Sequence, residues 1–257
     1  ARLAANALWT RLAQRRQFPE PAIQNFFIVV IIAIVVGARA LYVVTNWDHY
    51  AGDWKSIFAV HQGGMVFYGS FIGVVIGLWI FARRYRIAVL DLLDTCTAPS
   101  GLGLIIGRIG CLLVGDDYGT RVDADFPAAL KFPTPFESGR LYGLDIEKNN
   151  GNLAGPLQGE WLHPAQIYMS LNGLVLLLVM TWMGRRRRFA GQLTAAFCML
   201  YAVNRSIIEC FRGDEDRGFI DLPGIGRLST SQFIGIFVFA AGLAIAITQR
   251  KNTAGPI

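Results

Sequence analysis

The sequence carries little charge for its length. Of its 257 residues, only 16% are Asp, Glu, Lys or Arg, whereas a soluble globular domain has about 25%. Hydrophobic residues make up 53% of the chain and gather in long runs, which is typical of helices that cross a lipid bilayer. This shortage argues against a soluble globular protein.

A soluble basic domain is also absent, although the net charge is +6. The basic residues cluster at the ends of apolar runs, as in residues 83–86 and 185–188. Arginines in such places orient a membrane protein, whereas a nucleic-acid-binding protein gathers them on a soluble face. We therefore expect no nucleic acid as a partner.

Cysteine and histidine are scarce. The four cysteines form no C-x-x-C pair, so the sequence predicts no disulfide framework. A metalloenzyme built on His61, His163 and Cys111 is disfavoured, because no two of them have the spacing of a metal-ligand pair.

Six apolar segments are long enough to span the hydrocarbon layer as helices. They are residues 24–45, 65–82, 90–114, 165–184, 190–211 and 230–248. The chain begins without Met or a signal peptide, and residues 1–9 look like the tail of a further span, so we expect a truncated N-terminus. The predicted fold is an all-α polytopic membrane protein, a bundle of six visible transmembrane helices.

Charge predicts the orientation of this bundle. Basic clusters at residues 11–16, 83–86, 185–188 and 250–251 all fall on one side when the spans alternate, and the positive-inside rule makes that side cytoplasmic. The other side receives residues 115–164, which are polar and rich in Gly, Pro and Asn. We expect residues 1–114 and 165–257 to form the membrane bundle, with 115–164 as a small irregular or mixed domain and 212–229 as a loop on the outer side, which would be periplasmic in a bacterial inner membrane.

Ionisable residues within the predicted spans indicate a site. Arg205, Glu209 and Arg212 are spaced i, i+4 and i+7 and therefore share a helix face. They could be an internal ion pair that fixes helix packing. However, two arginines around one carboxylate leave a positive charge that an anionic lipid phosphate would neutralise.

Two more arginines lie within spans. Arg108 stands in a glycine-rich stretch, residues 101–110, where it is expected either to bind a ligand or to reach the outer interface. Arg39 fits packing and a site equally well. The paired glycines that follow His61 permit a broken helix near the outer interface, and His163-Pro164 opens the fourth span.

The ordered set of these stretches resembles the bacterial prolipoprotein diacylglyceryl transferase family. The resemblance runs from about Gly37 to Gln232. It rests on Gly37-Ala-Arg39, Gly63-Gly-Met-Val-Phe-Tyr-Gly69, Gly107-Arg-Ile-Gly110 with Tyr118-Gly119, His163-Pro-Ala-Gln-Ile-Tyr168, Arg205-Ser-Ile-Ile-Glu-Cys-Phe-Arg212 and Leu228-Ser-Thr-Ser-Gln232. The resemblance implies seven transmembrane helices in the inner (cytoplasmic) membrane, with an active site facing the periplasm.

The family also implies a reaction. Phosphatidylglycerol would be the donor and the lipobox cysteine of a prolipoprotein signal peptide the acceptor, with glycerol 1-phosphate released. No metal or soluble cofactor is implied. The rival interpretations are a non-catalytic paralogue that binds phospholipid or prolipoprotein, and a transporter or channel.

The resemblance assigns site residues by position. Arg108 takes the place of the phosphatidylglycerol-binding arginine and Arg205 that of an essential arginine. The predicted catalytic residues are Tyr68, Arg108, Arg205 and Asp116. The predicted substrate-binding residues are Arg108, Gly63, Gly64, Gly119, His163, Gln166, Tyr168, Glu209 and Arg212. For His163 a capping or orienting role remains open, and for Tyr168 an interfacial aromatic role.

Three positions depart from the family pattern. Tyr68 replaces a histidine, Cys111 an asparagine and Asp116 a glutamate. A neutral tyrosine is a poor proton acceptor, because its pKa of about 10 exceeds the value of about 8.5 for a thiol. The general base could therefore be Tyr68, Asp116 or no dedicated residue, with His61 as a further candidate.

Overall fold

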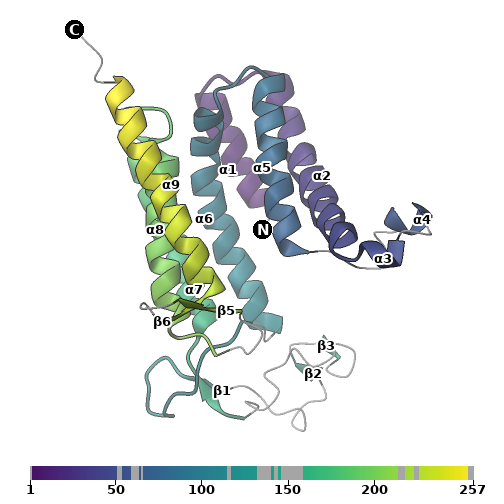
Figure 1. The fold of residues 1–257 in the computed structure, drawn as a ribbon. Helices are drawn as coiled ribbons and strands as arrows, with labels where there is room; N and C mark the ends of the chain where they lie inside the picture. Colours follow the sequence, from purple (N-terminus) through teal and green to yellow (C-terminus); the bar gives the residue numbers. More distant parts are fainter. Residues whose placement is uncertain are drawn as a thin grey trace. The chain divides into compact units, whose positions relative to one another are not determined.

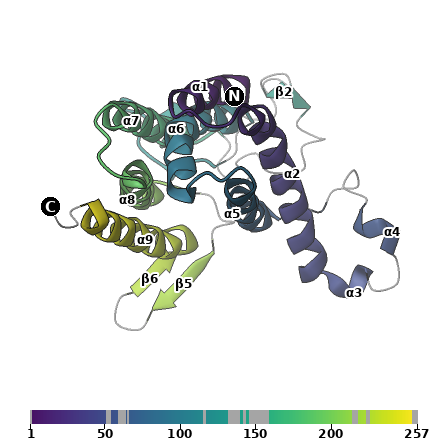
Figure 2. The ribbon, with the colours of Figure 1, turned by 90° about the horizontal axis from the view of Figure 1, so that it is seen from above.

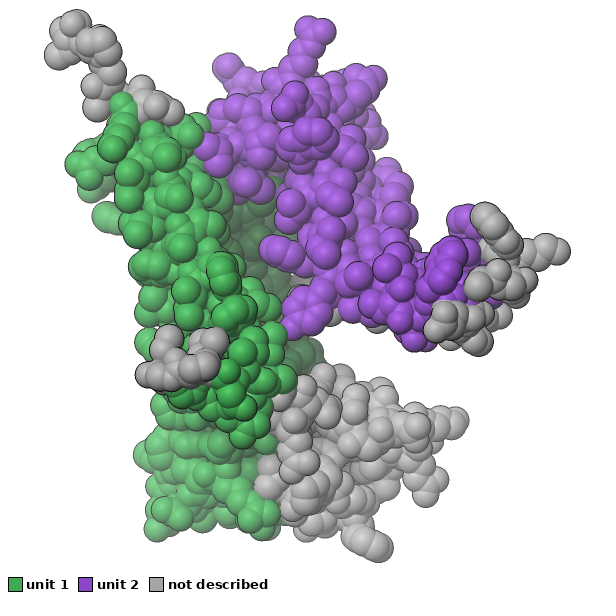
Figure 3. All heavy atoms as spheres, in the orientation of Figure 1, with its two compact units in different colours: residues 1–8, 96–257 green, residues 9–95 purple. Residues whose placement is uncertain are grey.

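The computed structural model is mainly helical and describes most of the chain. The described residues are 2–50, 54–58, 64, 66–114, 117–131, 140–141, 144–145, 159–213, 218–222 and 226–253. They form two compact units, residues 9–95 and residues 1–8 with 96–257 (Figure 3).

The long helices come in the order expected from the apolar segments (Figure 1). The helices are α1 (Arg2–Arg15), α2 (Glu20–Thr45), α3 (Trp47–Tyr50), α4 (Trp54–Ile57), α5 (Phe67–Arg84), α6 (Val89–Val114), α7 (Ala165–Gly184), α8 (Gln192–Glu209) and α9 (Thr230–Thr253). The strands are β1 (Leu130–Lys131), β2 (Arg140–Leu141), β3 (Leu144–Asp145), β4 (Trp161–Leu162), β5 (Phe219–Leu222) and β6 (Gly226–Ser229).

Within the described residues, four helices are long and apolar enough to cross a membrane. They are Glu20–Thr45, Val89–Leu113, Ala165–Gly184 and Thr230–Lys251. The predicted helical membrane fold is therefore confirmed at this level. The helices α5 and α8 coincide with the other two predicted spans, residues 65–82 and 190–211, and their role as spans stays a prediction.

The unit of residues 9–95 is built around a close contact between α2 and α5. On α5, Gly69 and Gly73 lie one helical turn apart and face Gly37 and Ala33 of α2. A Cβ atom at Gly73 would collide with the carbonyl oxygen of Ala33, so only glycine permits this approach. Small residues at such spacing are a common means of packing membrane helices.

Arg39 ties the following loop to α2 in the same unit. Its guanidinium donates hydrogen bonds to the carbonyl oxygens of Ser56, of Ile57 at 2.8 Å and of Gly64 at 3.1 Å. The rings of Tyr42 and Tyr50 also lie beside its charge. Arg39 is buried and satisfied by backbone carbonyls, which favours the packing interpretation.

The second unit contains α7, α8, α9 and most of α6. The helices α6 and α7 approach closely where Gly101 meets Gly173. The side chains of Asn204 and Asn172 join α8 to α7 with a 2.9 Å hydrogen bond. The α8 helix packs against α9, and the antiparallel β5–β6 hairpin leads into α9 (Figure 2).

The predicted outer segment, residues 115–164, contains only short antiparallel strand pairs among its described residues. Strand β1 pairs with β4, and β2 pairs with β3. Much of the segment lies outside the described residues, so its irregular or mixed character stays a prediction. Its position outside the membrane and its status as a domain stay predictions.

Candidate active site

Two arginines from distant parts of the chain bind the same carboxylate. Arg108 lies near the C-terminal end of α6, and Arg212 follows the end of α8. Arg108 forms an ion pair with Oδ2 of Asp117, and Arg212 forms one with Oδ1. We call these three residues the Asp117 bridge.

The backbone and its neighbours define the position of Asp117. This residue has a φ of +56°, a left-handed conformation that Asp tolerates better than most residues. Burial alone would raise the pKa of the Asp117 carboxyl, but the charges of Arg108 and Arg212 outweigh burial and hold that pKa below its usual range. The Cys111 side chain adds a hydrogen bond to the same carboxyl. Asp117 is therefore an anion at neutral pH.

A second ion pair is more deeply buried. Arg205 and Glu209 of α8 bind each other one turn apart, and their side chains are 10% and 3% exposed. Arg205 also donates a 3.0 Å hydrogen bond to the Ser231 hydroxyl at the start of α9. This interaction links α8 to α9 and fixes the direction of the Arg205 side chain.

The start of α9 is held by a capping box. The Gln232 backbone N–H donates to the Ser229 hydroxyl, and the Gln232 side-chain oxygen accepts from the Ser229 backbone N–H, both at 3.1 Å. The Gln232 amide also donates to the backbone oxygen of Ser206 on α8, at 3.4 Å. These contacts hold Ser231 where Arg205 reaches it.

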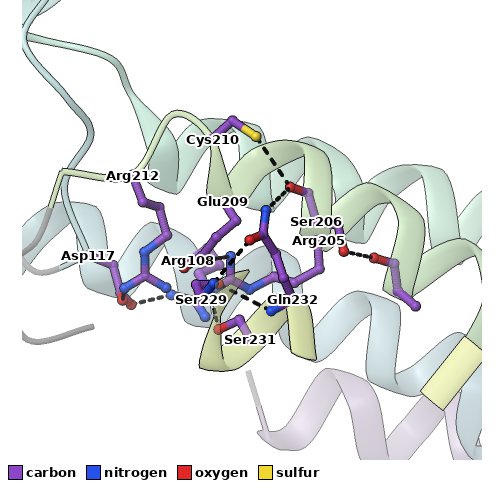
Figure 4. A network of polar contacts seen from close by, with 11 residues as sticks. Arg108, Asp117, Arg205, Ser206, Glu209, Cys210, Arg212, Ser229, Ser231 and Gln232 are labelled. Carbon is purple, nitrogen blue, oxygen red and sulfur yellow. Dashed lines mark hydrogen bonds and ion pairs between the residues drawn. The ribbon is translucent and has the colours of Figure 1, made fainter. Parts of the chain in front are cut away.

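The Asp117 bridge and the Arg205–Glu209 pair form one charged cluster near the C-terminal ends of α6 and α8 (Figure 4). Arg212 also interacts electrostatically with Arg205. The cluster therefore contains three guanidinium groups and two carboxylates among the described residues, an excess of one positive charge. An anion such as a phosphate would complete the balance.

Gly119 lies in a strand-like segment that pairs with the chain around Arg212 and with the chain at His163. Thr120 donates its N–H to Phe211 O, and His163 donates its N–H to Thr120 O, each at 2.9 Å. Gly119 itself pairs with Arg212. A Cβ atom on Gly119 would collide with the backbone oxygen and Cβ of His163, so a side chain at this position would push apart the segments that place Arg212.

His163 belongs to a small aromatic group. Its ring makes edge contacts with Phe126 and Phe211, and its Nδ1 lies 3.2 Å from the Tyr168 hydroxyl. The α7 helix starts at Ala165, after Pro164, and has no side-chain cap. This geometry favours an orienting role for His163 over capping. Gln166, on the first turn of α7, is buried.

The remaining predicted residues belong to the other unit or lie outside the described residues. Gly64 and Tyr68 belong to the unit of residues 9–95, where Gly64 has a φ of +76° and packs on Tyr42, and Tyr68 is 52% exposed. His61, Gly63 and Asp116 lie outside the described residues. The roles assigned to these five positions stay predictions.

Two residues that contact the arginines of the cluster were not predicted from the sequence. Asp117 was passed over because Asp116 stands at the family position, yet the adjacent carboxylate was a visible signal. Ser231 lies in the quoted Leu228–Gln232 stretch, but nothing in the sequence showed that Arg205 reaches it. Within the described ranges, no three His, Cys, Asp or Glu side chains come together as a metal site would require.

Comparisons with known proteins agree with this architecture. The family model described as prolipoprotein diacylglyceryl transferase matches residues 1–248. The chain is 31% identical to a phosphatidylglycerol–prolipoprotein diacylglyceryl transferase of Neisseria meningitidis serogroup A, over 92% of this chain and 85% of that protein. It is 30% identical to the protein of that name from Clostridium tetani, over 95% and 87%. It is 28% identical to phosphatidylglycerol–prolipoprotein diacylglyceryl transferase 2 of Clostridium perfringens, over 98% of this chain and 90% of that protein.

Proposed function

Because the chain belongs to the prolipoprotein diacylglyceryl transferase family, we propose that it transfers the diacylglyceryl group of phosphatidylglycerol to the lipobox cysteine of prolipoproteins. The chain is a multi-pass membrane protein and a transferase. The observation that supports the proposed chemistry most directly is the cluster of Arg108, Arg205 and Arg212, whose described residues carry one more positive than negative charge. A phosphodiester is the anionic part of the proposed donor.

In the proposed reaction, the cysteine thiolate attacks the glycerol carbon that bears the phosphate ester. A carbon–sulfur bond forms and the carbon–oxygen bond breaks. The electron pair of the broken bond goes to the phosphate oxygen, so glycerol 1-phosphate leaves with additional negative charge. Guanidinium groups that are already in position stabilise this charge as it develops, because they need no reorganisation.

The three arginines have different surroundings, which suit different roles in the proposed reaction. Arg205 is held by Glu209 and Ser231 and therefore provides a fixed positive charge. Arg108 and Arg212 meet at a single partly exposed carboxylate. We assign Arg108 and Arg212 to binding of the donor phosphate, and Arg205 to stabilising the charge of the leaving phosphate.

The thiol must also lose its proton. Tyr68, Asp116 and the absence of a dedicated base are the main possibilities, with His61 as a further candidate, and nearby guanidinium groups would favour the thiolate in each. Tyr68→Phe and Asp116→Asn separate them when each is assayed alone across pH. If both variants keep full turnover, neither residue is the base.

The direct test is a mass measurement. The purified protein is incubated with phosphatidylglycerol vesicles and a synthetic lipobox peptide, and a matched peptide with Ser in place of Cys serves as the control. We expect the cysteine peptide to gain one diacylglyceryl unit and the serine peptide to gain nothing. Binding of either substrate without any mass gain would instead support the non-catalytic paralogue.

We also propose that the protein resides in the inner membrane with the site facing the periplasm. The basic clusters all fall on one predicted side of the spans, and Arg108 and Arg212 lie at the opposite ends of their helices from those clusters. A donor lipid in the outer leaflet would then present its phosphate directly to the site.

A further inference from the structure

The Asp117 bridge has the form of an occupied anion site. Each of the two carboxylate oxygens binds a different arginine, one from α6 and one from beyond α8. A phosphodiester offers the same features, namely two unesterified oxygens on one centre and a single negative charge. Guanidinium groups bind carboxylates and phosphates with the same paired geometry.

We propose that Asp117 occupies the position of the donor phosphate in the ligand-free protein and gives up that position when the lipid binds. The inference rests on the proposed function, since it takes phosphatidylglycerol as the ligand. Asp117 would then act as a positioning residue that keeps Arg108 and Arg212 together until the phosphate replaces it.

The carboxylate of Asp117 is more accessible to solvent than that of Glu209, the other carboxylate described in the cluster. The Asp117 side chain is 24% exposed, and those of Arg108 and Arg212 are 20% and 11% exposed. Glu209 is only 3% exposed and shares a helix with its partner. An incoming phosphate can therefore reach and displace the Asp117 carboxylate, whereas the Glu209 carboxylate is shielded.

The proposed exchange of Asp117 for phosphate gives the carboxylate two electrostatic effects. Positively charged groups that are removed from water without a counter-ion are strongly destabilising, so the carboxylate stabilises the ligand-free site. The same carboxylate competes with the substrate, because the apparent affinity falls with the fraction of protein in which the site is available. Removal of the competing charge should therefore tighten phosphate binding.

Binding of inorganic phosphate and of glycerol 1-phosphate tests this directly. With the full-length protein in detergent micelles, titration calorimetry compares the wild type with Asp117→Asn and with the smaller replacement Asp117→Ser. We expect both variants to bind the two probes about fivefold more tightly or better. Unchanged or weaker binding would mean that Asp117 only organises the arginines, and the exchange would be wrong.

Two controls address a general charge effect. Asp123→Asn removes a charge from an exposed position in the same segment, and we expect no change in binding. Glu209→Gln removes a charge from the cluster but leaves the Asp117 bridge intact, and it should tighten binding clearly less than Asp117→Asn does. Equal tightening in Glu209→Gln and Asp117→Asn would overturn the exchange.

A measurement on the wild-type protein covers the case in which the variants fail to fold. Infrared difference spectra of protein labelled with carbon-13 aspartate should show a carboxylate band that shifts when phosphate is added. No shift at saturating phosphate contradicts the exchange. An inactive wild type with tighter binding in Asp117→Asn would refute the proposed function alone, whereas an active wild type with unchanged binding would refute the exchange alone.

Discussion

At the scale of single residues, the cluster depends on geometry as much as on charge. Arg205 contacts Glu209 and Ser231 at the same time. A planar guanidinium presents several donors in fixed directions, whereas a lysine ammonium is a single charge on a flexible stem. The function of Arg205 should therefore be lost even when its positive charge is kept.

The first prediction concerns Arg205→Lys. We expect kcat/KM for diacylglyceryl transfer to fall by about 100-fold, and Ser231→Ala to lower it by about tenfold, since each hydrogen bond to a charged group contributes about 1.5–3 kcal/mol. The mass-based transfer assay measures both. Arg185→Lys, at an exposed position after α7, is the matched control. Wild-type kcat/KM in Arg205→Lys would contradict the assigned role.

The second prediction concerns the pH dependence of stability at Asp117. Its folded-state pKa is lowered, mainly because the charges of Arg108 and Arg212 overcome the effect of burial. The carboxylate therefore contributes stability above its unfolded pKa of about 3.9, and this contribution disappears as the pH falls through the lower folded value.

We expect the difference in free energy of unfolding between the wild type and Asp117→Asn to be constant from about pH 8 to pH 5 and to shrink below about pH 4. Denaturant titration in micelles at each pH measures it. A difference that already shrinks between pH 7 and pH 5 would show that the pKa is not lowered.

The third prediction is that Gly119→Ala separates the segments around Arg212. The new methyl group meets the backbone of His163, so we expect a loss of about 1–3 kcal/mol in stability together with a loss of transfer activity. Thermal unfolding and the transfer assay measure the two effects. Gly103→Ala is the control, because no described atom lies within 4 Å of the Cβ position there. Equal effects of the two substitutions would refute this account.

At the scale of elements, the close contact between α2 and α5 depends on glycine at Gly69 and Gly73. The fourth prediction is that Gly73→Val lowers the unfolding temperature, because its side chain would overlap the Ala33 carbonyl and Gly37; overpacking of this kind costs about 1–3 kcal/mol. Thermal unfolding in micelles measures the effect, with Gly103→Val as the control. An unchanged unfolding temperature would mean that the two helices do not pack as described.

The sequence predicted the elements better than their contacts. Long apolar runs indicate helices whatever their partners, so α2, α6, α7 and α9 lie close to the predicted spans. The side of α2 that faces α5 was not predicted, because residues 26–37 are all apolar or glycine and give the helix no polar face there to orient it. The start of α9 at Thr230 agrees with the predicted span, but its capping box was not predicted, since a capping box is confirmed only by its hydrogen bonds.

The same reasoning explains how much of the site was predicted. Arg108, Arg205, Glu209 and Arg212 were found because charges in apolar runs stand out, and the structure brings them together. The choice of Asp117 as the shared partner depends on a left-handed backbone turn. Composition and spacing do not predict such a turn, because Asp adopts that conformation only where its surroundings require it.

At the scale of the whole molecule, the fifth prediction concerns orientation. Alkaline phosphatase, which is active only after export, is fused after Arg188 or after Asp125. We expect activity only for the Asp125 fusion, because the Arg185–Arg188 cluster should be retained in the cytoplasm. Green fluorescent protein fused at the same positions should give the opposite pattern. Phosphatase activity after Arg188 would reverse the proposed topology.

The Asp117 bridge has a consequence for biosynthesis. Its two arginines are contributed by parts of the chain on either side of α7 and α8, and the contact from Arg212 to Asp117 spans 95 positions. When Arg108 has emerged from the ribosome, Arg212 has not yet been synthesised. Under the proposed phosphate role of the bridge, the nascent protein would begin to bind phosphate only after α8 has entered the membrane, and an early truncation product would not bind the lipids around it.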